Sequence, residues 1–69
     1  MGKTFKVITI VGTSPNSCDE AIQKGIADAS ASLRNLAWFE VQETRGRVDQ
    51  GKVVEYQVKM QVGFKVEPS

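Results

Sequence analysis

Trp38 and Gln57 are the two side chains whose types and positions best suit the binding of a flat ligand. Trp38 is the only tryptophan, and strand alternation places its ring on the polar side of its segment, beside Glu40, Gln42 and Thr44. Such an indole either stacks on a ligand or fills a gap in a protein interface, and its position alone leaves both open. The Gln57 amide carries a donor and an acceptor that match the edge of a flat heterocycle, although glutamine on a polar strand face is commonly only solvated.

Two short segments have the composition of an anion site. Arg45-Gly46-Arg47 could grip a phosphate bidentately or form salt bridges between subunits, and both interpretations stay open. Gly12-Thr13-Ser14 precedes a predicted helix, whose free amide groups attract anions. It lacks the lysine of a P-loop and the full dinucleotide-binding pattern, so we interpret it as a strand-to-helix turn.

The chain lacks the residues of the common catalytic centres. It has no histidine and a single cysteine, Cys18, which excludes Ser-His and Cys-His pairs and the usual metal-ligand spacings. Glu40, Glu43, Glu55 and Glu67 could pair as acid and base, but charged residues that alternate along a strand are more typical of a solvated face. We predict no active site and no metal site, and we expect Cys18 to be reduced and to contribute to the packing of the helix rather than to chemistry.

Length and charge narrow the class of protein further. A chain of 69 residues forms one domain, spanning residues 1–69. A monomer of this size is only marginally stable, so we expect oligomerisation to provide additional stability. The net charge of +1 does not indicate binding to nucleic acid or to an anionic membrane. No apolar run approaches the ~20 residues that span a bilayer, and the N-terminus leads directly into a strand pattern. We therefore expect a soluble, cytoplasmic protein.

The pattern predicts the order β-α-β-β. Strands are expected over Phe5–Val11, Phe39–Val48 and Val53–Val66, the last two joined by a short hairpin through Asp49-Gln50-Gly51. A helix is expected over Ser17–Leu36. Its start is marked by a capping box of Ser17 and Glu20, and its apolar stripe consists of Cys18, Ala21, Ile22, Gly25, Ile26, Ala29, Leu33 and Leu36.

The third strand alternates almost strictly, with apolar side chains at the even positions from Val54 to Val66. Simple hairpin pairing sets even residues of the second strand opposite odd residues of the third, which places Trp38 on the same face as Gln57. This strand is longer than one helix can cover, so part of its apolar face is expected to meet another chain. The fold class is therefore α+β, an antiparallel three-stranded sheet wrapped on one helix in a symmetric assembly.

Several motifs together resemble the dodecins, small flavin-binding proteins, over nearly the whole chain. The segments that carry this resemblance are Val11-Gly12-Thr13-Ser14, Leu36-Ala37-Trp38-Phe39-Glu40-Val41, Arg45-Gly46, Tyr56-Gln57-Val58 and Val62-Gly63-Phe64-Lys65-Val66. The resemblance implies a hollow homododecamer that binds FMN or riboflavin in pairs, sandwiched between symmetry-related tryptophans that match Trp38. It also implies that Gln57 hydrogen-bonds the pyrimidine edge of the flavin and that Arg45 lies near the ribityl phosphate.

Bacterial dodecins of this kind also hold coenzyme A at subunit contacts, for which Lys6, Arg34 and Lys65 are the candidate residues here. Lys65 departs from the family pattern, because many members have arginine at this position and a lysine cannot grip a phosphate bidentately. The leading hypothesis is a flavin storage and sequestering protein that is not an enzyme. The alternatives are an interaction module whose assembly is its function, with Trp38 at an interface, and, ranked last, a flavin-dependent enzyme.

Overall fold

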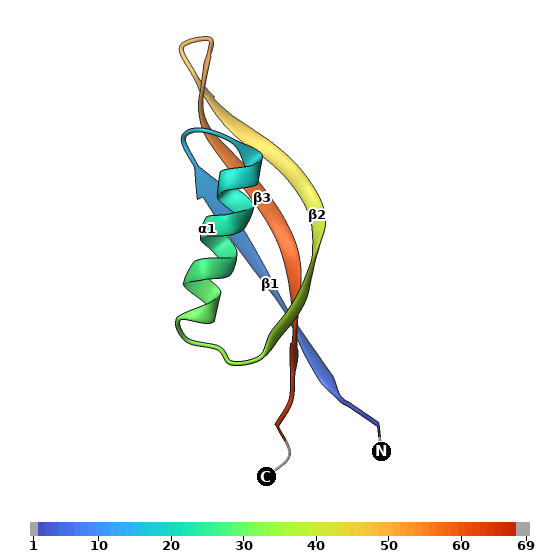
Figure 1. The fold of residues 1–69 in the computed structure, drawn as a ribbon. Coiled ribbons are helices and arrows are strands. Elements are labelled where there is room, and N and C mark those ends of the chain that lie inside the picture. Colours follow the sequence, from blue (N-terminus) through green and yellow to red (C-terminus); the bar gives the residue numbers. More distant parts are fainter. Residues whose placement is uncertain (1, 68–69) are drawn as a thin grey trace.

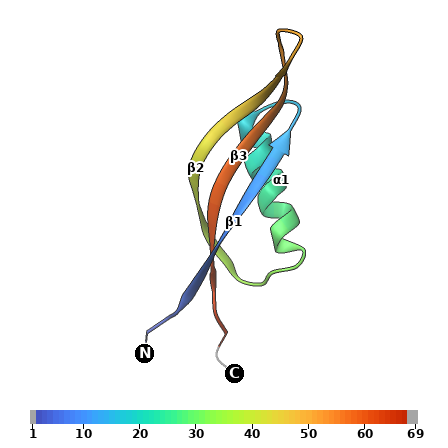
Figure 2. The same cartoon turned by 180° about the vertical axis from the view of Figure 1, so that it is seen from behind.

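The computed structural model describes residues 2–67 and consists of two layers, a three-stranded antiparallel sheet and one helix on one of its faces (Figure 1). The elements follow the order β1 (Phe5–Ser14), α1 (Cys18–Ser30), β2 (Leu36–Asp49) and β3 (Lys52–Lys65). The strand order β1-β3-β2 makes β3 central, so that both outer strands are edges. Seen from behind, the sheet lies in front of the helix and its other face has no second layer (Figure 2). The predicted β-α-β-β fold is confirmed.

The core lies between α1 and the central strand. Val58, Met60 and Val62 are fully buried, and they occupy alternate positions of β3 as the sequence pattern predicts. Ala21, in the first half of the helix, is also fully buried. The even-numbered face of β3 is therefore the helix face of the sheet, and the odd-numbered face is its outer face.

Two glycines allow the helix to lie very close to β1. A Cβ on Gly12 would collide with the backbone carbonyl oxygen of Ala21, and a Cβ on Gly25 would fall 2.8 Å from the Met60 Cε and 3.2 Å from the Gly12 Cα. Because neither glycine carries a side chain, the two backbones approach each other directly and the Met60 methyl group fills the remaining space. The small residues of the helix stripe thus serve packing, as predicted.

The helix begins where the sequence predicts it. Ser17 is the N-cap, and its hydroxyl accepts a hydrogen bond from the Glu20 backbone N–H at 3.0 Å. The Glu20 carboxylate turns toward the end of β1, where it accepts hydrogen bonds from the Ser14 hydroxyl and from Asn16 Nδ2, the latter at 2.8 Å. These two bonds, led by the one from Ser14, hold the pKa of the Glu20 carboxyl below its usual value.

The predicted end of the helix is wrong. α1 ends at Ser30 rather than at Leu36, so the last part of the predicted apolar stripe lies outside it. Asn35 takes a left-handed conformation with φ 63°, and its carbonyl oxygen accepts from the Lys65 N–H at 3.0 Å. Leu36 then pairs with Phe64, which makes it the first residue of β2. Pairing with β3 outweighs the local helical periodicity in this segment.

The first strand is longer than predicted. Gly12-Thr13-Ser14 continues β1 opposite residues 56–58 of β3, so this segment is a paired strand and not a turn. The turn into the helix takes only residues 15–17. Gly12 is required because the helix approaches β1 closely at this position. In the sequence alone, the same glycine is interpreted as part of a turn.

The register of β2 against β3 shifts at three points, between Leu36 and Trp38, between Val41 and Glu43, and between Arg47 and Val48. Even residues oppose odd ones at Trp38, which faces Gly63, but an irregularity between Val41 and Glu43 shifts the pairing by one residue. From Glu43 to Arg47, odd residues therefore face odd residues, contrary to the prediction. Alternation resumes at the hairpin, which lies where the sequence predicts it. Gln50 and Gly51 have φ 51° and 76° and form a two-residue turn between β2 and β3.

Much apolar surface is left uncovered by α1, which lies over β1 and β3 (Figure 1). Phe39 and Val41 point to the helix side of β2 but are 47% and 39% exposed. Val7 and Val11, on the outer face of β1, are each 48% exposed. The surface that calls for a partner thus lies chiefly on the two edge strands, whereas it was expected on β3.

Candidate functional site

Trp38 lies on the outer face of the sheet with its ring against β3. A Cβ built on Gly63 would fall 2.6 Å from Cη2 of the indole and closer still to Cε2 and Cζ2. The ring of Phe5, from the neighbouring end of β1, is 5.0 Å away between centroids and tilted by 60°. Trp38 remains 44% exposed, so the indole is supported by the strand and still open to a ligand.

A polar network occupies the same face nearer the hairpin. Arg45 Nε donates to Gln57 Oε1 at 2.7 Å, and Arg45 also forms an ion pair with Glu43 at 3.2 Å. Gln57 Nε2 donates in turn to Glu55 Oε1 at 2.8 Å, and Arg47 lies 3.8 Å from the same carboxylate. The arginines thus meet carboxylates of their own chain, and the irregularity in β2 brings Arg45 onto the face of Gln57.

The network fixes which way the Gln57 amide points. An arginine nitrogen can only donate and a carboxylate can only accept, so the amide oxygen must face Arg45 and the amide nitrogen must face Glu55. Each group keeps free capacity, because the nitrogen has a second N–H and the oxygen a second lone pair. Gln57 can therefore still offer one donor and one acceptor to a ligand edge.

Trp38 and Gln57 share a face, as predicted, but they do not form one site within a single chain. Trp38 lies opposite Gly63, and Gly63 is six residues from Gln57 along β3. At about 3.3 Å per residue this separation is ~20 Å. A ring stacked on Trp38 cannot reach the Gln57 amide of the same chain across that distance, so a site that uses both residues needs two copies.

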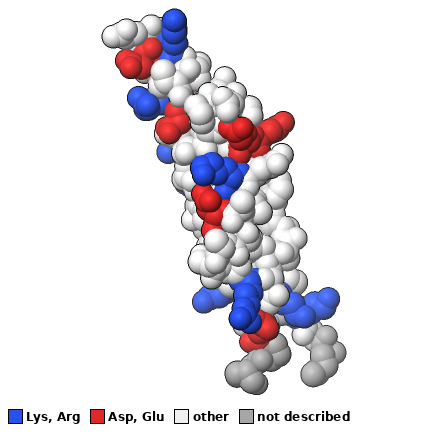
Figure 3. Space-filling model, turned by 60° about the vertical axis from the view of Figure 1, so that its left-hand side comes forward, with Lys and Arg blue, Asp and Glu red and all other residues white. Residues whose placement is uncertain are grey.

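The other three predicted residues gather near the end of the molecule that carries both termini, but on different surfaces. Lys6 faces Phe64 on the helix face of the sheet, whereas Lys65 is on the outer face opposite Phe5. Arg34, in the loop after α1, lies 3.9 Å from Glu67 in an exposed pair. Figure 3 shows lysine and arginine side chains around this end of the molecule. One chain therefore supplies dispersed charges rather than a formed anion pocket.

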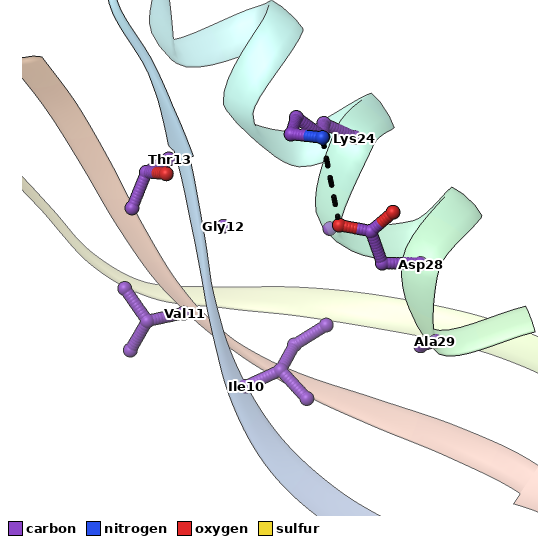
Figure 4. A pocket seen from close by; sticks show the side chains of 8 residues that line it. Ile10, Val11, Gly12, Thr13, Lys24, Asp28 and Ala29 are labelled. Carbon is purple, nitrogen blue, oxygen red and sulfur yellow. Dashed lines mark ion pairs between the residues drawn. The ribbon is translucent and has the colours of Figure 1, made fainter. Parts of the chain in front are cut away.

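A separate groove of about 270 Å³ lies between the open edge of β1 and α1 (Figure 4). Lys24 and Asp28 face each other beside it at 3.7 Å, and Gly12 and Gly25 are among the residues that line it. None of the predicted site residues lines it. Over residues 2–67 no group of three or more Cys, Asp or Glu side chains is placed to hold a metal ion, and no helix is long and apolar enough to cross a membrane.

Three features of this face are absent from the sequence-based predictions. The pairing irregularity near Gln42 carries no signal in residue type, so the partnership of Arg45 with Gln57 could not be expected. Gly63 does carry a signal, because it interrupts the row of polar residues on the outer face of β3 at the position that Trp38 covers. Phe5 was assigned only to a strand.

Similar proteins match this chain along almost its whole length. The dodecin family model matches residues 4–67. The dodecin of Thermus thermophilus is 48% identical over 67 residues, which cover 97% of this chain and 97% of that protein. The structure of the dodecin from Streptomyces davaonensis has a TM-score of 0.95 at 47% identity and covers 99% of this chain and 100% of that one. Calcium dodecin of Mycobacterium tuberculosis is 34% identical over 65 residues, 94% of this chain and 92% of that protein.

Proposed function

The chain belongs to the dodecin family, and we propose that it is a flavin-binding protein that stores and sequesters FMN or riboflavin. The observation that carries this proposal is the half-exposed indole of Trp38, held against β3 on a sheet face that no other element covers. An isoalloxazine can stack on that ring, and contact between the two aromatic systems quenches the excited state of the flavin. Stacking of bases on aromatic side chains contributes about 1–3 kcal/mol, which sets the scale expected here.

The binding site is formed by two copies of the chain. Trp38 of one copy supplies the stacking surface, and Gln57 of another supplies the donor and acceptor for the pyrimidine edge, since ~20 Å separates these residues within one copy. Dodecins assemble as dodecamers. The uncovered Phe39 and Val41 and the open edges of β1 and β2 support the same assembly here, because both features call for further copies.

The proposal also assigns roles to the basic residues that could contact phosphate groups. Arg45 lies beside Gln57 and is the residue placed to meet a ribityl phosphate. Lys6, Arg34 and Lys65 are the candidates for the phosphates of coenzyme A, which they would approach from more than one chain. In this proposal the protein stores and sequesters flavin in the cytoplasm. It is not an enzyme, because flavins stacked in pairs between tryptophans leave little room for a substrate.

The test is a titration of FMN and riboflavin fluorescence with the refolded, ligand-free protein, with particle size measured in the same samples. Strong quenching by a large oligomer is expected, and Trp38→Ala should abolish most of it while preserving the particle. An oligomer of full size that leaves flavin fluorescence unchanged would contradict the proposal. Collapse of the assembly in Trp38→Ala would instead favour an interaction module in which Trp38 fills an interface.

A further inference from the structure

The backbone of Gly63 forms the surface against which the Trp38 indole lies. Three consecutive atoms of the indole, Cε2, Cζ2 and Cη2, all lie within 2.6 Å of the position that a Gly63 Cβ would take. The position is as near to Cε2 as to Cζ2, and a point beyond the rim with those two distances would lie much farther from Cη2, so this position falls over a ring face. One face of the indole is therefore turned to the strand, and the other is turned away from it.

Two local features bring the indole to this glycine. Pairing of β2 shifts by one residue between Leu36 and Trp38, which sets Trp38 directly opposite Gly63. Phe5 then contacts the indole from the end of β1, with a tilted arrangement of 60° that aromatic pairs favour. The strand limits how the indole can tip inward, and the phenyl ring limits how it can turn sideways.

We infer that Gly63 and Phe5 are positioning residues that fix the plane of Trp38 and thereby set the orientation of the stacked flavin. This inference deepens the proposed function and rests on it for the ligand. Because one face of the indole is covered by the strand, each Trp38 can stack on a single flavin ring. The stacked ring must lie parallel to the indole, so its polar edge is confined to one plane, in which the Gln57 amide of another chain has to meet it.

Gly63→Ala is the direct test. The added methyl group would occupy the space of the indole, and the half-exposed Trp38 is free to swing away from it. Gly63 does not have a left-handed φ, so alanine fits the strand backbone without strain. The matched control is Gly2→Ala, whose methyl group meets nothing within 4 Å.

Two measurements are made on each variant, the near-ultraviolet circular dichroism of the flavin-free protein and the dissociation constant for FMN. Gly63→Ala should retain the particle size but lose the dichroic signal of its single tryptophan, and it should bind FMN about tenfold more weakly, while Gly2→Ala matches the wild type. An unchanged signal and unchanged affinity in Gly63→Ala would overturn the inference while leaving the flavin proposal intact.

Phe5→Leu keeps the test decisive if Gly63→Ala does not fold. It preserves an apolar side chain but removes the ring that contacts the indole, and it should weaken FMN binding about threefold with a partial loss of the tryptophan signal. No change in either measurement would count against Phe5 as a positioning residue. If the wild type itself binds no flavin, the proposed function fails, and the dichroic signals of the two variants still decide whether these residues orient Trp38.

Discussion

Arg45 Nε donates to Gln57 Oε1 at 2.7 Å, across the pair of strands formed by β2 and β3. The contact exists because the pairing shifts between Val41 and Glu43; without that shift Arg45 would lie on the opposite face of the sheet. Together with Glu55 it gives the Gln57 amide one orientation. The flavin proposal therefore implies that Arg45 and Glu55 influence selectivity among ligands by orienting the Gln57 amide.

Glu55→Gln should loosen this orientation. A glutamine at position 55 can donate as well as accept, so only the hydrogen bond from Arg45 would still favour one orientation of the Gln57 amide. We expect about threefold weaker FMN binding, and a smaller difference in affinity between FMN and an analogue methylated at the N3 position of the flavin. Isothermal titration with both ligands measures this difference. Equal discrimination in the variant and the wild type would show that Glu55 does not orient the amide.

Arg45→Ala should lower the affinity for FMN more than the affinity for riboflavin. If the guanidinium meets the ribityl phosphate, its loss should weaken FMN binding about tenfold and riboflavin binding much less, since riboflavin has no phosphate. Fluorescence titration of both flavins gives the two ratios. Arg47→Ala is a matched control, because Arg47 is paired with Glu55 at 3.8 Å and does not contact Gln57. Equal losses for both flavins would assign Arg45 to Gln57 rather than to the phosphate.

Mixed assemblies test whether two copies share the site. Trp38→Ala and Gln57→Ala subunits are each expected to bind flavin poorly, but co-refolding them should create some sites with an intact Trp38 from one variant and an intact Gln57 from the other. Flavin quenching per subunit should then exceed that of either variant refolded alone. No gain on mixing would mean that Trp38 and Gln57 act within one chain, contrary to the distance along β3.

Protonation of Glu20 should lower the stability of the folded protein at acidic pH. Its folded pKa is depressed below the ordinary value of 4.5, so its contribution is fully present above about pH 4.5 and is lost as the pH falls through the folded pKa. Glu20→Gln should therefore be less stable than the wild type at pH 7, and the gap in stability should narrow as the pH falls below about 4.5. Thermal unfolding from pH 7 to pH 3 measures this gap. A gap that stays constant across this range would exclude titration of Glu20 as its cause.

Gly12→Ala should be strongly destabilising. The new methyl group would collide with the backbone carbonyl of Ala21, which cannot move without displacing the helix, so a loss of about 3 kcal/mol is expected. Gly25→Ala is the comparison, because its nearest neighbour is the flexible end of Met60, and alanine also favours the helix. Urea unfolding of both variants should show the larger loss for Gly12→Ala. A smaller loss there than in Gly25→Ala would contradict the close approach of the two backbones.

The strands and the helix start could be predicted because local signals agree with the fold. Strict alternation in β3 marks Val58, Met60 and Val62 as core, and Ser17 with Glu20 marks the start of α1. The end of the helix could not be predicted, since pairing of Leu36 with Phe64 is decided by contacts distant in sequence.

The same limit applies to the candidate site. Trp38 and Gln57 were identified from residue type and alternation, and the structure places them on one face as expected. Their separation along β3 follows only from the register, and the contact of Arg45 with Gln57 follows only from the shift in pairing near Gln42. The contact between Gly63 and the indole could not be predicted from the sequence, because it depends on the register that sets Trp38 opposite Gly63.

Every residue of β2 from Ala37 to Asp49 is exposed in the single chain, although this strand carries both Trp38 and Arg45. In the proposed assembly, neighbouring copies bury this strand, so folding of the chain is coupled to its association and depends on the protein concentration. The melting temperature then rises with protein concentration even without ligand. A cell that makes little of the protein would hold chains with no competent site, and flavin capacity would increase more steeply than the amount of protein.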